Sequence, residues 1–226
     1  MSDDVARDVA GRVAAVRERI AAAARAAGRA PDAVRLVAAT KTQTVDAVRA
    51  VLAAGVTDVG ENRAQELAAK APELAVDAPT WHFIGRLQRN KVNQLAPWVQ
   101  WWESVDRAEL VDALASRAPG ARLLVEVNVA GEAQKGGCSP ADAPALVERA
   151  RAGGLVPVGL MTVAPAEGDP RPVFAGLREL AQRLELPELS MGMSGDYEAA
   201  IAEGATIVRV GTALFGPRPA PPTIGP

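Results

Sequence analysis

Residues 34–55, VRLVAATKTQTVDAVRAVLAAG, contain the pattern that decides the fold class. The stretch begins with an apolar run of strand length and continues with an amphipathic, alanine-rich segment that ends at Gly55, a common helix stop. The same succession of a short apolar run and a helical segment recurs along the chain. Such alternation predicts parallel strands joined by helices.

The pattern predicts eight strands in all. They are expected at residues 34–41, 57–62, 81–85, 101–105, 122–129, 155–163, 189–194 and 206–214. Eight strands alternating with helices indicate a single (β/α)8 barrel, the TIM barrel. Residues 1–218 are assigned to this α/β domain and the proline-rich residues 219–226 to a tail. Because no helical segment follows the last strand, residues 3–27 are expected to form an extra N-terminal helix covering that side.

Composition excludes several classes of function. The 226 residues are 49% apolar and 23% charged with a net charge of −2, as in a soluble globular protein without a basic surface for nucleic acid. One cysteine, Cys138, and one histidine, His82, exclude a disulfide framework and a Cys/His metal cluster. His82 is expected to be a hydrogen-bonded structural residue. No membrane-spanning run or signal core is visible, so a cytoplasmic location is expected.

Polar residues at the predicted strand ends form the candidate site, because function in this barrel collects there. Lys41 ends the first strand, Ser194 and Gly195 follow the seventh, and Gly211 and Thr212 lie at the end of the eighth. Turns after strands seven and eight commonly bind phosphate, since free backbone N–H groups favour an anion. The first strand of a closed barrel adjoins the eighth, so the lysine and the phosphate site should face one mouth.

A lysine amine beside a phosphate site indicates pyridoxal phosphate (PLP), whose aldehyde forms an imine with lysine. Arg209, on the eighth strand, is expected to point into the mouth between them. A guanidinium beside the pyridine nitrogen disfavours its protonation, because two cations repel, and so makes the cofactor a weaker electron sink. That arrangement suits binding or limited proton chemistry. The alternative for Arg209 is a structural ion pair.

The sequence resembles the pyridoxal phosphate homeostasis protein family, single-barrel relatives of the alanine racemase N-terminal domain. The resemblance runs from about residue 37 to residue 216. Its matching stretches are AATKTQT, DVGENRAQE, WHFIGRLQRNK, SVDR, VEVNVAGEAQKGG, GLMTV and LSMGMSGDYEAAIAEGATIVRVGTALFG. The resemblance therefore implies a barrel like that of the fold type III PLP-dependent enzymes, without their C-terminal β-domain.

The resemblance also assigns the cofactor residues. It implies a Schiff base on Lys41, a position for Arg209 near the ring nitrogen and for Asn62 close to the cofactor, and phosphate contacts from Ser194, Gly211 and Thr212. An N-cap of the helix starting near residue 62 is the alternative role for Asn62. A loop containing Glu132, Lys135 and Gly137 also matches the family, with no role that its residues explain.

The function implied by the resemblance is the binding, buffering and delivery of PLP without catalysis, with transfer of the cofactor to apo PLP-dependent enzymes. A monomer is expected because a dimer-forming β-domain is missing. One alternative is a PLP-dependent amino-acid racemase of narrow scope, and a second is a Schiff-base aldolase. Both need a further acid or base opposite Lys41, and none is visible. The only tyrosine, Tyr197, starts the helix after the phosphate turn. No catalytic or metal-ligating residue is therefore assigned.

Overall fold

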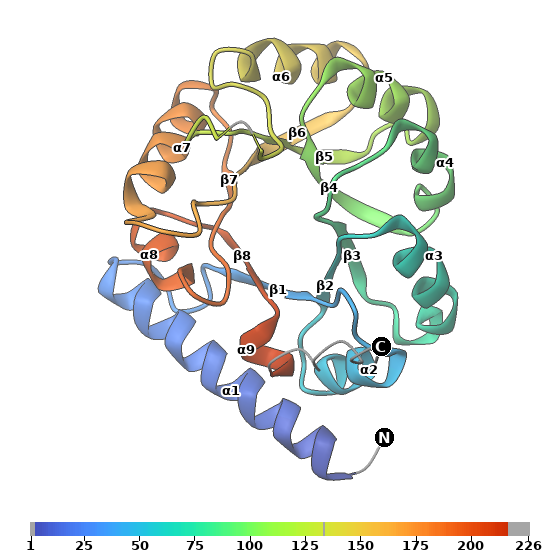
Figure 1. The fold of residues 1–226 in the computed structure, drawn as a ribbon, viewed down its shortest axis with the longest axis vertical. Helices are drawn as coiled ribbons and strands as arrows, with labels where there is room; N and C mark the ends of the chain where they lie inside the picture. The colour runs from blue at the N-terminus through green and yellow to red at the C-terminus, as the bar shows by residue number, and fades with distance from the viewer. Residues whose placement is uncertain (1–2, 133, 217–226) are drawn as a thin grey trace, which may run out of the picture.

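The computed structural model describes residues 3–132 and 134–216, and its eight parallel strands close into a barrel (Figure 1). The strands are β1 (Arg35–Ala39), β2 (Asp58–Glu61), β3 (Thr80–Phe83), β4 (Val99–Val105), β5 (Arg122–Glu126), β6 (Val156–Met161), β7 (Glu188–Ser190) and β8 (Ile207–Val210). They are hydrogen-bonded in sequence order, and β8 pairs with β1. The predicted TIM barrel is confirmed. The tail predicted at 219–226 lies outside the described residues.

Helices surround the barrel on the outside (Figure 1). They are α1 (Asp3–Ala26), α2 (Val45–Ala53), α3 (Ala64–Glu73), α4 (Val92–Leu95), α5 (Ala108–Arg117), α6 (Ala143–Ala152), α7 (Arg171–Arg183), α8 (Tyr197–Ala202) and α9 (Thr212–Phe215), with 3-10 turns η1 (Ala75–Asp77) and η2 (Arg89–Lys91). The eighth strand predicted at 206–214 was too long. Its last residues form α9, because the carbonyl of Gly211 accepts from the N–H groups of Leu214 and Phe215.

The N-terminal helix takes the place that a long helix after β8 would occupy. Val9, Val13, Val16 and Ile20 recur every three or four residues along α1 and are buried. Helix α1 packs against α8, α9 and α2, which bring the two ends of the barrel sequence together (Figure 1). The extra helix predicted from residues 3–27 therefore covers the expected side.

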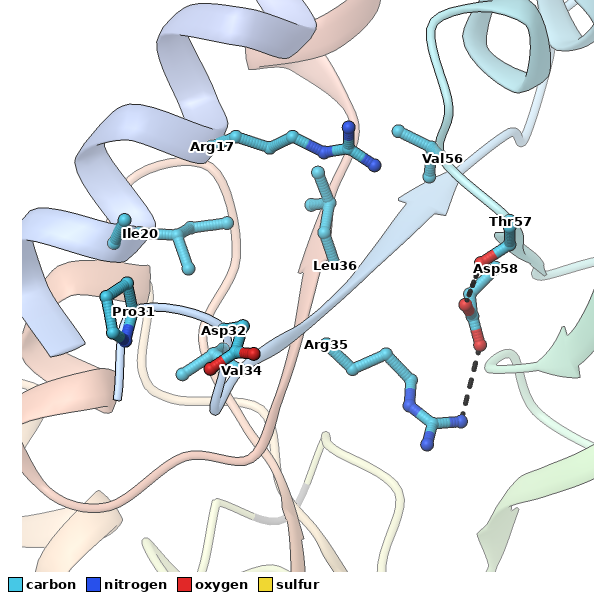
Figure 2. A pocket seen from close by; sticks show the side chains of 11 residues that line it. Arg17, Ile20, Pro31, Asp32, Val34, Arg35, Leu36, Val56, Thr57 and Asp58 are labelled. Carbon is cyan, nitrogen blue, oxygen red and sulfur yellow. Dashed lines mark hydrogen bonds and ion pairs between the residues drawn. The ribbon is translucent and has the colours of Figure 1, made fainter. Parts of the chain in front are cut away.

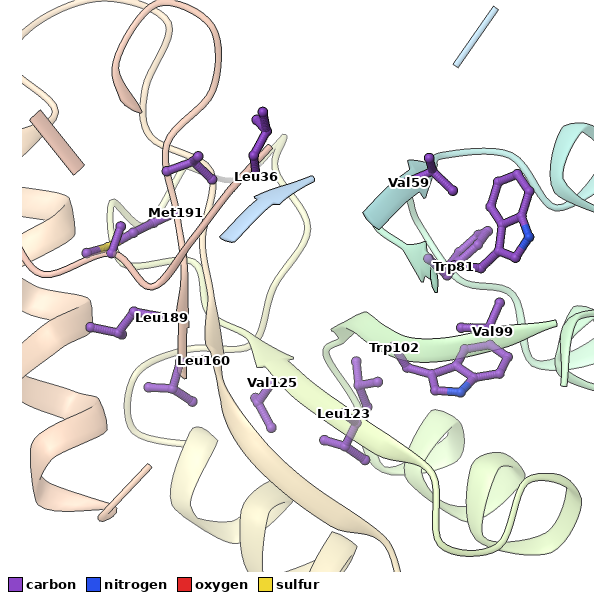
Figure 3. Close-up of a cluster of buried hydrophobic side chains, with 14 of the residues drawn as sticks. Leu36, Val59, Trp81, Val99, Trp102, Leu123, Val125, Leu160, Leu189 and Met191 are labelled. Carbon is purple, nitrogen blue, oxygen red and sulfur yellow. The ribbon is translucent and has the colours of Figure 1, made fainter. Parts of the chain in front are cut away.

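The apolar core lies mainly between the barrel and its helices, where outward-facing strand residues such as Leu36, Trp102 and Leu160 are buried (Figure 3). Successive strand residues face opposite sides, so their neighbours point into the barrel. A small inner cluster contains Val37, Trp101, Leu124, Met161 and Ile207. Buried charged side chains also lie among the strands, including Glu103 and Arg209, and Arg209 is the register partner of Val37 in this cluster.

Within the described part of the chain, no helix is long and apolar enough to cross a membrane. The same residues contain no group of three or more His, Cys, Asp or Glu side chains that could hold a metal ion.

Candidate functional site

A cavity of about 230 Å³ opens at the C-terminal ends of β1, β7 and β8. Five of the six predicted cofactor residues line it: Lys41, Ser194, Arg209, Gly211 and Thr212. They come from two regions of sequence more than 150 residues apart, which meet because β1 pairs with β8. The remaining lining residues are Ala39, Gln43, Met193, Gly195, Phe215 and Gly216.

One wall of the cavity presents an oxygen held by backbone donors. Ser194 Oγ accepts hydrogen bonds from the N–H groups of Gly211 at 3.2 Å and Ala213 at 3.3 Å. A hydroxyl that accepts twice keeps its own proton to donate. Gly211 allows the two strand ends to approach, since a Cβ there would lie 3.2 Å from the carbonyl oxygen of Ala39. This wall therefore gathers hydrogen-bond donors around one point.

Arg209 lies on β8 and reaches the cavity although its side chain is buried. Its guanidinium donates to Ser190 Oγ at 2.5 Å and to the carbonyl of Thr162 at 2.9 Å. The carboxylate of Glu103 lies 3.9 Å away. Burial lowers the pKa of Arg209, and the charge of Glu103 opposes that shift. Arg209 therefore lines the cavity and also forms the structural ion pair, with Glu103, that was considered as its alternative role.

Sequence reasoning missed the polar network that supports Arg209. His82 Nδ1 lies 2.5 Å from Glu103 Oε1, and His82 Nε2 lies 3.0 Å from Asp58 Oδ1. Ionised carboxylates only accept, so both ring nitrogens donate and His82 is an imidazolium. Burial opposes this charge, but the hydrogen bonds with Asp58 and Glu103 outweigh it and raise the pKa of His82. Trp101 stacks on the imidazole with ring centroids 5.4 Å apart.

Lys41 follows β1 in a turn and is half-buried. The next residue, Thr42, has a positive φ of 65°, which non-glycine residues rarely adopt. The N–H of Gln43 donates to the carbonyl of Thr40 at 3.0 Å and closes this turn. The lysine is therefore placed at the cavity by a short, specifically shaped segment.

Asn62 is the predicted residue that does not line the cavity. The N-cap position of α3 is Arg63, and no side chain caps that helix, so the alternative role of Asn62 as an N-cap was wrong. Its Oδ1 is buried without a hydrogen-bond partner among the described residues. A buried acceptor of this kind is costly unless something donates to it.

The loop that contains Glu132 and Lys135 lies beside the cavity mouth. Lys135 pairs with Glu132 and donates to the carbonyl of Ala164 at 2.8 Å. A second cavity of about 440 Å³, lined in part by Lys135, shares Met193 and Gly195 with the first. The shared lining residues place Lys135 of this loop beside the mouth of the first cavity.

Glu126 ends β5, and an added Cβ at Gly136, in the loop that follows, would lie 3.3 Å from its carboxylate. Burial, with a smaller contribution from the charge of Asp106, raises the pKa of Glu126 to about 7. This residue was also missed from sequence, because a single glutamate at a strand end carries no periodic signal.

Another cavity, of about 440 Å³, lies between α1 and the N-terminal ends of β1 and β2 (Figure 2). It contains the ion pair between Arg35 and Asp58, whose nearest atoms are 3.4 Å apart. Its lining includes no lysine and none of the predicted cofactor residues. Since function in this fold collects at the opposite ends of the strands, the smaller cavity is the better candidate.

Comparison with known proteins identifies the family. Residues 12–219 match the alanine racemase N-terminal domain. The pyridoxal phosphate homeostasis protein of Pseudomonas aeruginosa is 46% identical over 220 residues, which cover 93% of this chain and 96% of that protein. The chain belongs to the pyridoxal phosphate homeostasis protein family. The resemblance stated from sequence is confirmed.

Solved structures agree with membership of the pyridoxal phosphate homeostasis protein family. PipY of Synechococcus elongatus without PLP has a TM-score of 0.82 at 36% identity, and with PLP bound 0.75 at 34%. Each alignment covers 92% of this chain and 100% of PipY. Alanine racemase of Corynebacterium glutamicum has a TM-score of 0.67 at 14% identity, with 96% of this chain and 62% of the racemase aligned. The last likeness concerns the fold alone.

Proposed function

We propose that this protein binds PLP in the cavity between β1 and β8 and serves intracellular PLP homeostasis by holding and releasing the cofactor. The observation that carries the proposal is the meeting of Lys41 with Ser194, Gly211 and Thr212 in one cavity lining. PipY, solved with PLP bound, is 34% identical to this chain and supports the assignment.

The residues of the cavity fit the chemical groups of the cofactor. PLP supplies an aldehyde that condenses with a primary amine with loss of water, and a pyridine ring that withdraws electrons. Lys41 provides the amine. The Ser194 hydroxyl, held by the backbone N–H of Gly211, and the side chain of Thr212 provide the polar wall for a phosphate. Asn62 lies outside this lining, and its buried Oδ1 has no hydrogen-bond partner among the described residues.

Arg209 determines the charge on the cavity wall. Its guanidinium is fixed by Ser190 and by the carbonyl of Thr162, so it stays in place. A fixed cation disfavours a second positive charge beside it and thus a protonated pyridine ring. Because an unprotonated ring withdraws electrons weakly, this arrangement favours holding the cofactor over carbanion chemistry.

The described residues that line the cavity include few ionisable groups. Apart from Lys41 and Arg209, the described lining contains no titratable side chain. Tyr197 is 1% exposed, its hydroxyl is buried, and Arg19 lies over its ring at 5.1 Å. These observations favour a binding role over the racemase and aldolase alternatives. The proposal includes transfer of PLP to apo PLP-dependent enzymes.

The test is titration of the purified protein with PLP, followed by borohydride reduction and peptide mapping. We expect a visible absorbance band and a reduced label on Lys41, both lost from that residue in Lys41→Ala. A label found only on Lys70, Lys91 or Lys135 of the unsubstituted protein, or no band, would overturn the assignment. Racemisation of amino acids by the loaded protein would instead favour the enzyme alternative.

A further inference from the structure

The peptide groups on both sides of Lys41 are held by side chains from α3. Thr40 precedes the lysine, and its carbonyl accepts a hydrogen bond from Lys70 Nζ at 2.9 Å. Thr42 follows it, and its N–H donates to Glu66 Oε2 at 2.7 Å. The lysine is thus the one residue between two anchored peptide groups.

The two anchors belong to one ion-pair cluster, which we call the Lys70 cluster and define as Glu61, Glu66 and Lys70. Lys70 Nζ lies 2.5 Å from Glu61 Oε1 and 3.3 Å from Glu66 Oε2. Glu61 Oε1 also accepts from the hydroxyl of Thr40 at 2.9 Å, and Glu61 Oε2 from the N–H of Asn62 at 3.2 Å. The cluster therefore joins β1, β2 and α3 directly beneath the lysine.

The Lys70 cluster is largely buried, and burying charged groups costs free energy of folding. The Glu61 side chain is fully buried and the Lys70 side chain is 10% exposed. Burial raises the pKa of Glu61, although the hydrogen bond and charge of Lys70 oppose the shift. Buried ion pairs often stabilise a fold no better than apolar residues of similar size. The pair also fixes the geometry of the adjacent backbone at Thr40.

The backbone at Thr42 shows that the geometry is imposed. Its φ of 65° is unfavourable for a β-branched residue and persists only where surrounding contacts determine it. Glu66 provides such a contact through the Thr42 N–H, while Lys70 holds Thr40 from the other side. The two anchors therefore act on the turn that carries Lys41 from both sides.

We propose that Lys70, acting with Glu61 and Glu66, is a positioning residue that fixes the backbone of Lys41 so that its amine meets the PLP aldehyde. The inference rests on the proposed function and names residues that act through Lys41 rather than by touching the cofactor. The phosphate wall, which consists of Ser194, Gly211 and Thr212, follows β7 and β8 and includes the first residue of α9. The hydrogen bonds of Ser194 join it to Gly211 and Ala213 rather than to the cluster.

This separation defines the experiment. The affinities of Lys70→Met, Glu66→Ala and the double variant Glu61→Gln/Lys70→Met, which removes both members of the most buried pair, are measured for PLP and for 4-deoxypyridoxine 5-phosphate, which keeps ring and phosphate but lacks the aldehyde. Glu73→Ala, at an exposed position of the same helix, is the matched control. Thermal unfolding without ligand reports whether each variant folds.

We expect the cluster variants to lose about 10-fold to 100-fold in PLP affinity, the range that misplacement of a reacting group by an ångström causes. Affinity for the aldehyde-free analogue and all properties of Glu73→Ala should stay within about twofold, because the phosphate wall is untouched. If Lys70→Met does not fold, Glu66→Ala decides the result, because its more exposed carboxylate leaves no buried charge unpaired.

Equal loss of both ligands, or no loss of either, would overturn the positioning role. If the unsubstituted protein binds the analogue but forms no bond with PLP, the proposed function itself is contradicted. The two failures are therefore distinguishable in one series of titrations.

Discussion

His82 Nδ1 lies 2.5 Å from Glu103 Oε1 inside the barrel. This contact connects Asp58, on β2, to Arg209 in the cavity wall. On one side of the pair, Asp58 accepts from the histidine. On the other, Ser190 donates to Glu103 and accepts from Arg209. Positive and negative groups alternate through the barrel, where branched apolar side chains usually fill the layers. The site is thus supported by charge as well as by packing.

Replacing His82 by glutamine should remove a pH-dependent part of the stability. Because the pKa of His82 is raised in the folded protein, its contribution is fully present below the unfolded pKa, about 6.5, and is lost as pH rises through the folded pKa. At pH 6, the variant should be less stable by about 2–4 kcal/mol, and the difference should shrink with rising pH. Urea unfolding between pH 6 and 9 measures it, and a constant difference would contradict the assignment.

Glu126→Gln should have the opposite effect on stability at alkaline pH. The folded pKa of about 7 exceeds the unfolded value of 4.5, so the contribution of Glu126 is present below pH 4.5 and lost as pH rises through 7. At pH 8 the variant should therefore be more stable by up to about 3 kcal/mol, and at pH 4.5 equal. Exposed Glu109→Gln is the control. A gain that does not depend on pH would contradict the prediction.

Ser194→Ala tests the phosphate wall. The substitution removes the hydroxyl that accepts from Gly211 and Ala213, and with it a donor to the phosphate. We expect roughly tenfold weaker binding of PLP, the value of one hydrogen bond to a charged group. Pyridoxal, which has no phosphate, should bind unchanged. Ser116→Ala, on the exposed side of α5, is the control, and equal loss of both ligands would argue against a phosphate contact.

A double-mutant cycle on Arg209 and Glu103 tests whether the buried charges act as a unit. Arg209→Met alone should cost about 3–5 kcal/mol of stability, because it leaves the fully buried Glu103 without one of its two cations. Glu103→Gln added to Arg209→Met should cost less than Glu103→Gln alone. Chemical denaturation of the four proteins gives the coupling energy, expected to exceed about 1 kcal/mol. Additive losses would show that the groups are independent.

Much of the fold follows from local patterns. The eight strands were found because each is a short apolar run bounded by glycines or helical segments, and the meeting of Lys41 with Gly211 follows from the closure of an eight-stranded barrel. The end of the last strand was misplaced because Thr212, Ala213 and Leu214 fit a strand as well as a helix. Only the hydrogen bonds to the Gly211 carbonyl decide between them.

The charged interior was beyond reach from sequence. His82, Glu103 and Arg209 lie on three different strands, and their contact depends on the stagger between strands, which no local pattern encodes. Trp101 lies inside the barrel, stacked on His82. The cluster around Lys70 was missed for a related reason, since a lysine late in an amphipathic helix is normally solvated.

Because β1 pairs with β8, the cavity forms only when the first and last strands of the barrel come together. Lys41 is synthesised about 170 residues before Gly211, so a growing chain has no complete cavity until its barrel closes. A ligand bonded to both edges would be an additional bridge across that junction. Loading and closure would then be linked, because a ligand that binds only the closed ring stabilises that ring by mass action.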